Sequence, residues 1–228
     1  MKFKDVISVG TSCATKYQIG LKMFKSQFPG RSDDEYRHVV HAAGSKPDFL
    51  GTNVFDWKIT PSYAVALQLE SGFHGSFERD DLAVMPDGHV HNTKIGTALP
   101  HDFHAGTEGR LTERDLDDQY PEALRKHSYL VKKFLNRLNQ PGPYLYVLRD
   151  FPDASIVDRI VSCLGASKVH DFHLLLLGVG ELGNYAAISD RIHTGSLPVE
   201  IRKPPQYHWE GDDENWDAIL SRFECEWW

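Results

Sequence analysis

The sequence predicts an α/β fold: a three-layer sandwich with a mostly parallel sheet, helices on both faces and a β-hairpin insertion. Continuous apolar runs at residues 6–9, 144–148 and 174–177 are typical of strands that are buried on both faces. The first two runs are each followed by an amphipathic helical pattern, as in βα units of a parallel sheet. Because there are no repeats, low-complexity runs or obvious linkers, we expect one domain over residues 1–228.

The first strand and helix are marked by a sharp change of pattern. The apolar run breaks at Gly10, and Thr11 or Ser12 then offers a side-chain oxygen as the N-cap of a helix. An apolar stripe at helical spacing follows the cap and predicts that the helix packs on the sheet. The stripe consists of Ala14, Tyr17, Leu21 and Phe24.

The middle of the chain combines helices with a hairpin. The polar stretch 30–51 predicts a weak helix at best, whereas Thr60-Pro61-Ser62 is a helix start with proline in the first turn. Alternation over 82–103 around Pro86-Asp87-Gly88 predicts the hairpin. A long apolar stripe predicts a helix from Asp115 to Asn139, which Pro141-Gly142-Pro143 ends.

The last third contains the clearest strand–helix–strand unit. Asp153 or Ser155 caps a helix that Gly165 closes, and residues 184–189 are read as a further strand. Gly178-x-Gly180-x-x-Gly183 matches a dinucleotide fingerprint, but that fingerprint requires a following helix. We therefore expect a turn here and no cofactor.

Composition limits the classes of partner and the compartment. A formal net charge of −7 over 228 residues argues against nucleic acid and anionic membranes as main partners. No apolar stretch is long enough to span a membrane, and the first residues do not resemble a signal peptide. Three cysteines do not suggest a disulfide framework, so we expect a reducing, cytoplasmic setting. A small molecule, a peptide or a carbohydrate is the expected substrate.

Chemistry-bearing residues follow three of the predicted strands. Cys13, Arg149-Asp150 and the Gly178 turn would share one edge if the strands are parallel, and ligands bind at that edge. Cys13 would lie in the first helical turn, where free N–H groups lower a thiol pKa and favour a nucleophile. Such a thiol needs a base, for which we choose His101 first and His104 second.

The remaining candidate site residues surround this pair. Asp102 or Asp56 would orient the base, and Arg149 would bind an anionic group of the substrate. Asp56 lies between Phe55 and Trp57, so we expect it to be buried and bound by backbone amides or an arginine. The residues expected to contact substrate are Ser12, Asp56, Trp57, His104 and Arg149.

Three alternatives use some of the same residues. A metal site could be formed by His89, His91, His101 and His104, although this spacing is permissive rather than diagnostic and no metal is expected. A serine esterase or acyltransferase acting on polysaccharide would use Ser12 with Asp190 and His193. A carbohydrate or nucleotide-sugar binding module without catalysis would use Trp57 and Arg149.

These motifs together resemble a known family. Ser8-Val9-Gly10 with Cys13, then Phe55-Asp56-Trp57 with Thr60-Pro61, then His101-Asp102-Phe103 are similar to a bacterial family of papain-like cysteine peptidases, a domain of unknown function. The resemblance extends from about residue 5 to residue 177. It implies that Cys13 is the nucleophile and His101 the base of a cysteine hydrolase or acyltransferase. The start, Gly-Thr-Ser-Cys-Ala, also resembles the Gly-Ser-Cys-Phe-Ala family of the SGNH-type esterase group.

Overall fold

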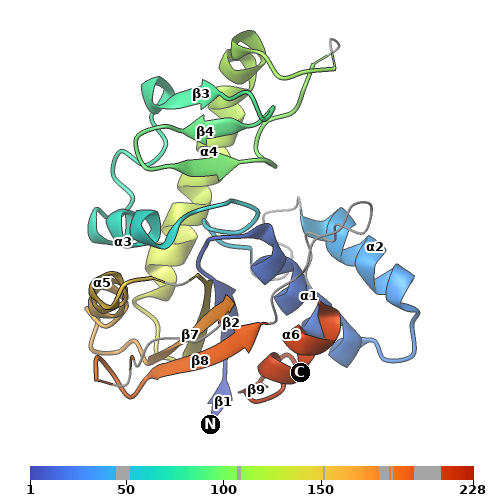
Figure 1. The fold of residues 1–228 in the computed structure, drawn as a ribbon, viewed down its shortest axis with the longest axis vertical. Helices are drawn as coiled ribbons and strands as arrows, with labels where there is room; N and C mark the ends of the chain where they lie inside the picture. Colours follow the sequence, from blue (N-terminus) through green and yellow to red (C-terminus); the bar gives the residue numbers. More distant parts are fainter. Residues whose placement is uncertain (45–51, 107–108, 151, 180–184, 186, 198–211) are drawn as a thin grey trace.

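A four-stranded parallel sheet forms the centre of the computed structural model (Figure 1). The model describes residues 1–228 except 45–51, 107–108, 151, 180–184, 186 and 198–211. The strand order is β2-β6-β7-β8, and all neighbouring pairs are parallel. The strands are β2 (Asp5–Ser8), β6 (Tyr144–Arg149), β7 (Phe172–Val179) and β8 (Ile192–Leu197). This confirms the predicted α/β class.

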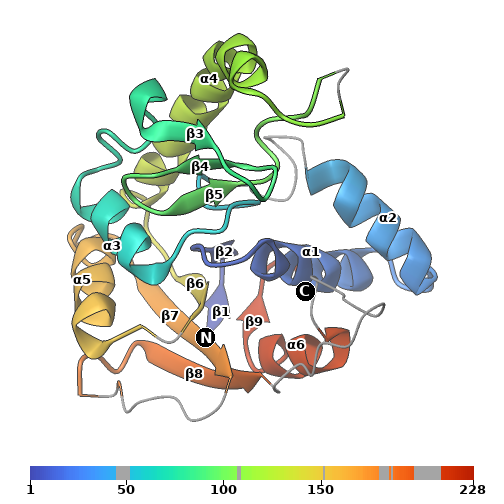
Figure 2. The same ribbon diagram turned by 45° about the horizontal axis from the view of Figure 1, so that its top comes forward.

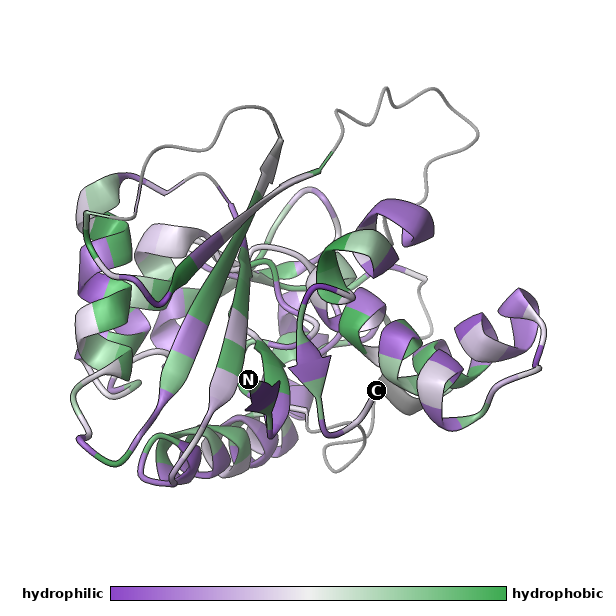
Figure 3. Cartoon of the chain, turned by 90° about the horizontal axis from the view of Figure 1, so that it is seen from below, coloured by the Kyte–Doolittle hydropathy of each residue, from purple (hydrophilic) through white to green (hydrophobic). Residues whose placement is uncertain are grey.

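Side chains of the central strands alternate between two apolar cores. On β6, Tyr146 and Leu148 face one core, whereas Leu145 and Val147 face the other. β7 alternates in the same way, and its residues 174–177 are fully buried. Figure 3 shows green segments along these strands, between helices in which green and purple alternate. Burial on both faces explains why the strands read as continuous apolar runs in the sequence.

Helices cover both faces of the sheet, as expected for a three-layer sandwich. One face packs against α3, α4 and α5, and the other against α1 and α6. These helices are α1 (Cys13–Gln27), α3 (Ser62–Glu70), α4 (Glu113–Arg137), α5 (Ala154–Leu164) and α6 (Asp213–Leu220). The predicted helix starts after Ser12 and Asp153 are confirmed, whereas Pro61 is the N-cap of α3 rather than a residue of its first turn.

The polar stretch after α1 contains more helix than the sequence led us to expect. Helix α2 (Asp33–Gly44) begins with three acidic residues, which suit the positive end of a helix dipole. Ser32 and Glu35 exchange hydrogen bonds at its start, with the Ser32 N–H donating to Glu35 Oε2 at 2.9 Å. Tyr36 and Val40 then bury its apolar side, so the prediction of a weak helix at best was wrong.

The apolar stripe of α1 packs on α2 rather than on the sheet. Tyr17 and Leu21 form a small buried cluster with Tyr36 and Val40, and Phe24 lies against it. Ile19, on another side of α1, belongs to the core beneath the sheet. The predicted packing of this helix on the sheet is confirmed, but Ile19 makes the contact and the stripe itself is covered by α2.

The predicted hairpin insertion forms a three-stranded antiparallel sheet, separate from the parallel sheet (Figure 2). Its strands are β3 (Leu82–Val84), β4 (Val90–Asn92) and β5 (Thr97–Leu99), preceded by a short 3-10 helix, η2 (Arg79–Asp81). Leu82, Val90 and Leu99 pack with Leu116 and Ala123 from the first half of α4. Helix α4 thus joins the insertion to the main sheet, because its second half packs there through Leu130 and Phe134.

Helix α4 matches the predicted helix closely, whereas the last strand does not match its prediction. Thr112 and Asp115 form a reciprocal capping box, which starts α4 two residues before the predicted position. The strand predicted over 184–189 is not found at Tyr185 or at residues 187–189, which form turn and irregular structure. The strand begins instead at Ile192, where β8 pairs with β7.

The chain ends lie together at the amino end of the sheet. Strand β1 (Lys2–Phe3) pairs in parallel with β9 (Glu224–Cys225). Trp227 and Trp228 pack against the core at the surface, and the Trp228 Nε1–H donates to the Phe223 carbonyl at 3.0 Å. Among the helices that the structure describes, none combines the length and apolar character needed to cross a bilayer.

Candidate functional site

Cys13 is the first residue of α1, at the carboxyl end of β2. The Val9 N–H donates to the Val147 carbonyl at 2.9 Å and completes the sheet, and Gly10 then turns the chain with φ of +100°. Ser12 is the N-cap, since its Oγ accepts from the Ala14 N–H at 3.1 Å. Gly10 is required for space as well, because a Cβ there would lie 2.9 Å from the Thr60 carbonyl oxygen.

Loops from three parts of the chain meet beside this turn. The Thr11 N–H donates to the Thr60 carbonyl at 2.8 Å, and the Thr11 hydroxyl contacts the carbonyl of Arg149 at the end of β6. The Asp150 carboxylate accepts from the Ser62 N–H at the start of α3, at 3.1 Å. The expectation that Cys13 and Arg149-Asp150 share one sheet edge is therefore confirmed, whereas Gly180 lies outside the described residues.

Asp56 is a buried carboxylate that ties its loop to α1. Its Oδ2 accepts from the Asn53 N–H at 2.8 Å, and Asn53 Nδ2 donates to Oδ1 at 3.0 Å. Lys16 Nζ lies 3.0 Å from Oδ2, in an ion pair almost fully removed from solvent. Burial raises the pKa of Asp56, against the opposing charge of Lys16. The expected backbone amide is confirmed as a partner, but the cation is Lys16 rather than an arginine.

Trp57 and His101 meet next to this pair. Their ring centroids are 5.4 Å apart with the planes at 76°, an edge-to-face contact. Trp57 has a φ of +63°, a strained conformation for a bulky residue, and such residues cluster at functional sites. Burial lowers the pKa of His101, although the neighbouring Asp102 works against the shift. At neutral pH the imidazole is therefore uncharged, the form that accepts a proton.

Asp102 is a largely buried carboxylate that pairs with a lysine of α4. Lys126 Nζ lies 2.9 Å from Asp102 Oδ1. Burial acts to raise the pKa of Asp102, but the charge of Lys126 and its hydrogen bond act against burial, and the pKa is lowered. Asp102 is therefore ionised beside His101.

The Cys13 thiol lies within electrostatic reach of both carboxylates, in a dry environment. Cys13 is 7% exposed to solvent. Burial raises the pKa of Cys13 to about 12, and the charges of Asp56 and Asp102 add to the increase. The N–H of Cys13 itself acts in the opposite direction but does not compensate. The expected lowering of this pKa is thus not found, because burial and two carboxylates outweigh the helix terminus.

Two further residues expected to contact substrate lie at the margin of this group. The His104 N–H donates to Gln119 Oε1 at 2.9 Å, and its carbonyl accepts from Gln119 Nε2 at 2.8 Å, which fixes an exposed position against α4. Arg149 is half-buried at the end of β6. Ser12 is engaged as the helix cap. The structure therefore places Cys13 within electrostatic range of Asp56 and Asp102, and it packs Trp57 against His101, the neighbour of Asp102.

The metal alternative receives no support from the described part of the chain. His91 Nε2 lies 2.8 Å from Asp87 Oδ2 on the exposed hairpin, so its imidazole is engaged there. Among the described residues, no group of three or more His, Cys, Asp or Glu side chains is arranged to hold a metal ion.

The serine-based alternative is not assembled either. His193 lies on β8 in register with Leu175 of β7, and through it with Val147 and Ser8. Three strand spacings, about 14 Å, therefore separate His193 from the β2 strand that leads to Ser12. The His193 ring instead lies 2.9 Å from His173, Nε2 to Nδ1. Of the dinucleotide fingerprint, Gly178 is within β7, and Gly180 and Gly183 lie outside the described residues.

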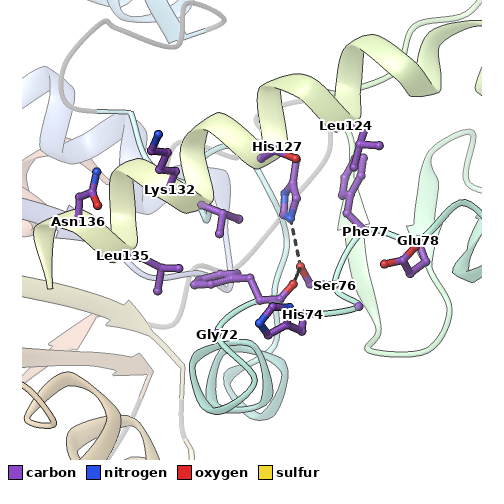
Figure 4. Close-up of a pocket in the computed structure, with 14 residues that line it drawn as sticks. Gly72, His74, Ser76, Phe77, Glu78, Leu124, His127, Lys132, Leu135 and Asn136 are labelled. Atoms are coloured by element: carbon purple, nitrogen blue, oxygen red, sulfur yellow. Dashed lines mark hydrogen bonds between the residues drawn. The ribbon is translucent and has the colours of Figure 1, made fainter.

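A second polar cluster, which the sequence did not reveal, forms around His127. His127 on α4 joins two residues that are distant in sequence. Its Nε2 is 3.1 Å from Ser76 Oγ (Figure 4), and its Nδ1 is 3.2 Å from Lys58 Nζ. His127 occupies a position that fits the buried side of an amphipathic helix, and neither Lys58 nor Ser76 belongs to a motif. No spacing in the sequence could have linked the three.

No family model, no curated protein and no solved structure matches the chain. The family resemblance of the sequence motifs therefore stays a prediction, and the chemistry of the site must be argued from its own residues.

Proposed function

We propose that the protein is a cysteine-dependent hydrolase or acyltransferase in which Cys13 attacks a carbonyl carbon. The observation that supports this most is the convergence at the start of α1. There, the Cys13 thiol lies within electrostatic reach of Asp102, whose neighbour His101 carries an uncharged imidazole. Acyl transfer requires a nucleophile and a base, and we assign these roles to Cys13, at the carboxyl edge of the parallel sheet, and to His101.

The raised pKa of Cys13 decides how the thiol would react. At pH 7 the resting sulfur is protonated, so the thiol resembles a serine hydroxyl more than a preformed thiolate. A base must therefore take the proton as the sulfur attacks. His101 suits this role because partial desolvation of its exposed residue lowers the pKa, so the imidazole is neutral at pH 7, and ionised Asp102 beside it would stabilise the imidazolium that forms.

The helix start would contribute at a later stage. Attack by the thiol places negative charge on the carbonyl oxygen, and N–H groups at a helix N-terminus stabilise such charge. The N–H of Cys13 lies at this end of α1, and Ser12 caps the helix by accepting from the Ala14 N–H. Trp57 would form the wall against which the substrate packs, and Arg149 would bind an anionic group.

Trapping of the acyl-enzyme tests the proposal. The protein would be incubated with aryl thioester acyl donors and analysed by peptide mass spectrometry, with Cys13→Ala as the variant and Cys163→Ala as the matched control. We expect an acyl group on Cys13 that neutral hydroxylamine removes, since thioesters are cleaved under these conditions. Labelling that is equal in wild type and Cys13→Ala, or that falls only on Cys163, would refute the proposal.

A further inference from the structure

We propose that Ser76 is a second nucleophile, activated by His127 and Lys58, and that it accepts acyl groups from small apolar carboxylic esters bound in the adjoining pocket. This site is separate from Cys13 and does not depend on the function proposed above. Figure 4 shows His127 reaching from α4 toward Ser76, on the loop that follows α3. The Ser76 Oγ to His127 Nε2 distance of 3.1 Å is within the range for proton transfer from a nucleophile to its base.

The direction of the hydrogen bonds depends on Lys58. Its ammonium would present three N–H groups to a buried site, but among the described residues it has one hydrogen-bond acceptor, His127 Nδ1 at 3.2 Å. The Phe77 ring lies 5.4 Å from Nζ. An ammonium with so few acceptors is costly to bury, whereas a neutral amine accepts a hydrogen bond through its lone pair.

Burial, rather than the neighbouring charges, favours the neutral amine of Lys58. Burial lowers the pKa of Lys58 and Lys126 adds to this effect, while Asp102 and Asp56 oppose it. Burial also lowers the pKa of His127 to about 2, so the imidazole is neutral. With a neutral amine at Nδ1, the imidazole proton resides on Nδ1, and Nε2 is left as an acceptor for the Ser76 hydroxyl.

The Ser76 hydroxyl can donate its hydrogen bond to more than one acceptor. Its proton has two acceptors within reach, the Phe73 carbonyl at 2.8 Å and His127 Nε2 at 3.1 Å. Rotation about the C–O bond exchanges them. The Gly75 and Phe77 N–H groups flank this hydroxyl in the chain, and neither has a hydrogen-bond acceptor among the described residues. Free N–H groups next to a nucleophile are suited to stabilise an oxyanion.

The backbone of this loop is strained. Phe73 has a φ of +67°, and Gly75 has a φ of +68°. A left-handed conformation is costly for a bulky residue and persists only where its surroundings enforce it. Such outliers cluster at functional sites. Here the strained residue supplies the carbonyl that shares the Ser76 proton.

The pocket next to Ser76 indicates the class of substrate. It has a volume of about 470 Å³ and lies between residues 72–78 and α4. Phe73, Val131 and Leu135 give it an apolar wall, with Lys132 and Asn136 among its polar lining residues. This volume falls within the range of small-molecule sites. Apolar esters with a short acyl chain fit these walls.

The reaction balances without a cofactor. Ser76 Oγ forms a bond to the carbonyl carbon while its proton passes to His127 Nε2. The bond from that carbon to the leaving alkoxide breaks, and the alkoxide takes the proton and leaves as an alcohol. One water molecule then hydrolyses the serine ester, giving a carboxylic acid and restoring the hydroxyl.

The test uses p-nitrophenyl acetate and butyrate with the full chain carrying Cys13→Ala, so that failure of the Cys13 proposal cannot decide the result. Release of p-nitrophenolate is followed by absorbance, and the acylated residue is identified by mass spectrometry. We expect acylation of Ser76, and loss of at least about 100-fold in its rate in Ser76→Ala and His127→Gln, the range typical of a general base and its nucleophile. Ser155→Ala, at an exposed position on α5, is the matched control and should behave like its parent.

Circular dichroism establishes that each variant is folded, and the conservative Ser76→Ala variant decides the outcome if His127→Gln unfolds. Acylation confined to other residues in the folded parent, or an equal rate in Ser76→Ala and Ser155→Ala, would overturn the proposal.

Discussion

The loop of residues 56–58 contributes side chains to both the Cys13 site and the Ser76 site, yet the two nucleophiles have opposite electrostatic surroundings. Asp56 of this loop points to α1 and pairs with Lys16, whereas Lys58 reaches His127 on α4. Cys13 feels two carboxylates, which raise its pKa. Ser76 has no such neighbour in its hydrogen-bonded group and contacts an imidazole directly.

The difference shows that position in a helix does not by itself activate a nucleophile. Cys13 has the N-terminal location that lowers a thiol pKa in many proteins, but burial and the charges of Asp56 and Asp102 dominate. Ser76 lies in a loop with no helix dipole, and its base is within hydrogen-bond distance. The base that would serve Cys13 must therefore act during the reaction rather than before it.

The largest expected effect is a loss of stability when Asp56 of the shared loop is replaced. Replacing Asp56 by alanine leaves Lys16 buried without its carboxylate, and breaking such a pair costs about 3–5 kcal/mol in the free energy of unfolding. Urea denaturation measures this. Asp33→Ala, which breaks an exposed ion pair with Lys25, is the control and should leave stability nearly unchanged. Equal losses in the two variants would show that Asp56 does not hold the loop on α1.

Substituting the glycine in the turn before each nucleophile should have a smaller effect on stability, and the size of this effect should differ between the two turns. In Gly10→Ala, the new Cβ meets the Val65 side chain at 2.8 Å and the Thr60 carbonyl oxygen at 2.9 Å, on a backbone with φ of +100°. We expect a loss of about 2 kcal/mol or more in unfolding free energy. Gly75 also has a positive φ, but the new Cβ of Gly75→Ala would approach only Lys94 Nζ, at 3.9 Å, so strain alone should cost about 1 kcal/mol. Thermal unfolding of both variants gives the order, which the reverse ranking would contradict.

The cysteines provide a kinetic contrast. A shift of the Cys13 pKa from 9.0 to about 12 lowers its thiolate fraction at pH 7 about a thousandfold. Cys163 is half-exposed and Cys225 is buried. Iodoacetamide should therefore alkylate Cys163 first in the native protein, as mapped by peptide mass spectrometry over time. Faster alkylation of Cys13 would show a preformed thiolate and would remove the need for a base.

The smallest expected effect comes from a histidine pair outside both sites. His173 and His193 stack with centroids 5.1 Å apart, and burial lowers the pKa of each below 6.5. A lowered histidine pKa gives stability that is present at higher pH and is lost as the pH falls through 6.5, because the unfolded chain then binds more protons. The melting temperature should fall between pH 7 and 5, and His193→Gln should reduce that fall by roughly 2–4 °C. A fall of the same size in the variant would exclude the pair as its cause.

The sequence predicted those features that arise from local pattern. The strands β6 and β7 are continuous apolar runs because both faces of the sheet are covered, and α4 carries its capping residues in the sequence. The burial of Asp56 was also predictable, since two large aromatic residues flank it.

Features that depend on contacts between distant segments were not predictable. Helix α2 becomes stable by packing Tyr36 and Val40 on α1, and its position redirects the stripe that was expected to face the sheet. The pKa of Cys13 depends on where Asp56 and Asp102 lie in space, which the position of Cys13 in the sequence does not reveal. His127, Lys58 and Ser76 come from three separate elements, so only the fold brings them together.

The rate of Cys13 acylation in His101→Gln tests the central claim most directly. The measurement would use an aryl thioester at pH 7 in a Ser76→Ala background, with the adduct on Cys13 quantified by mass spectrometry. Because the resting thiol is protonated, removing the base should slow acylation by at least about 100-fold. His38→Gln, at an exposed position on α2, should leave the rate unchanged. An unaltered rate in His101→Gln would contradict the account, since the thiol would then react without the imidazole that the proposal assigns to it.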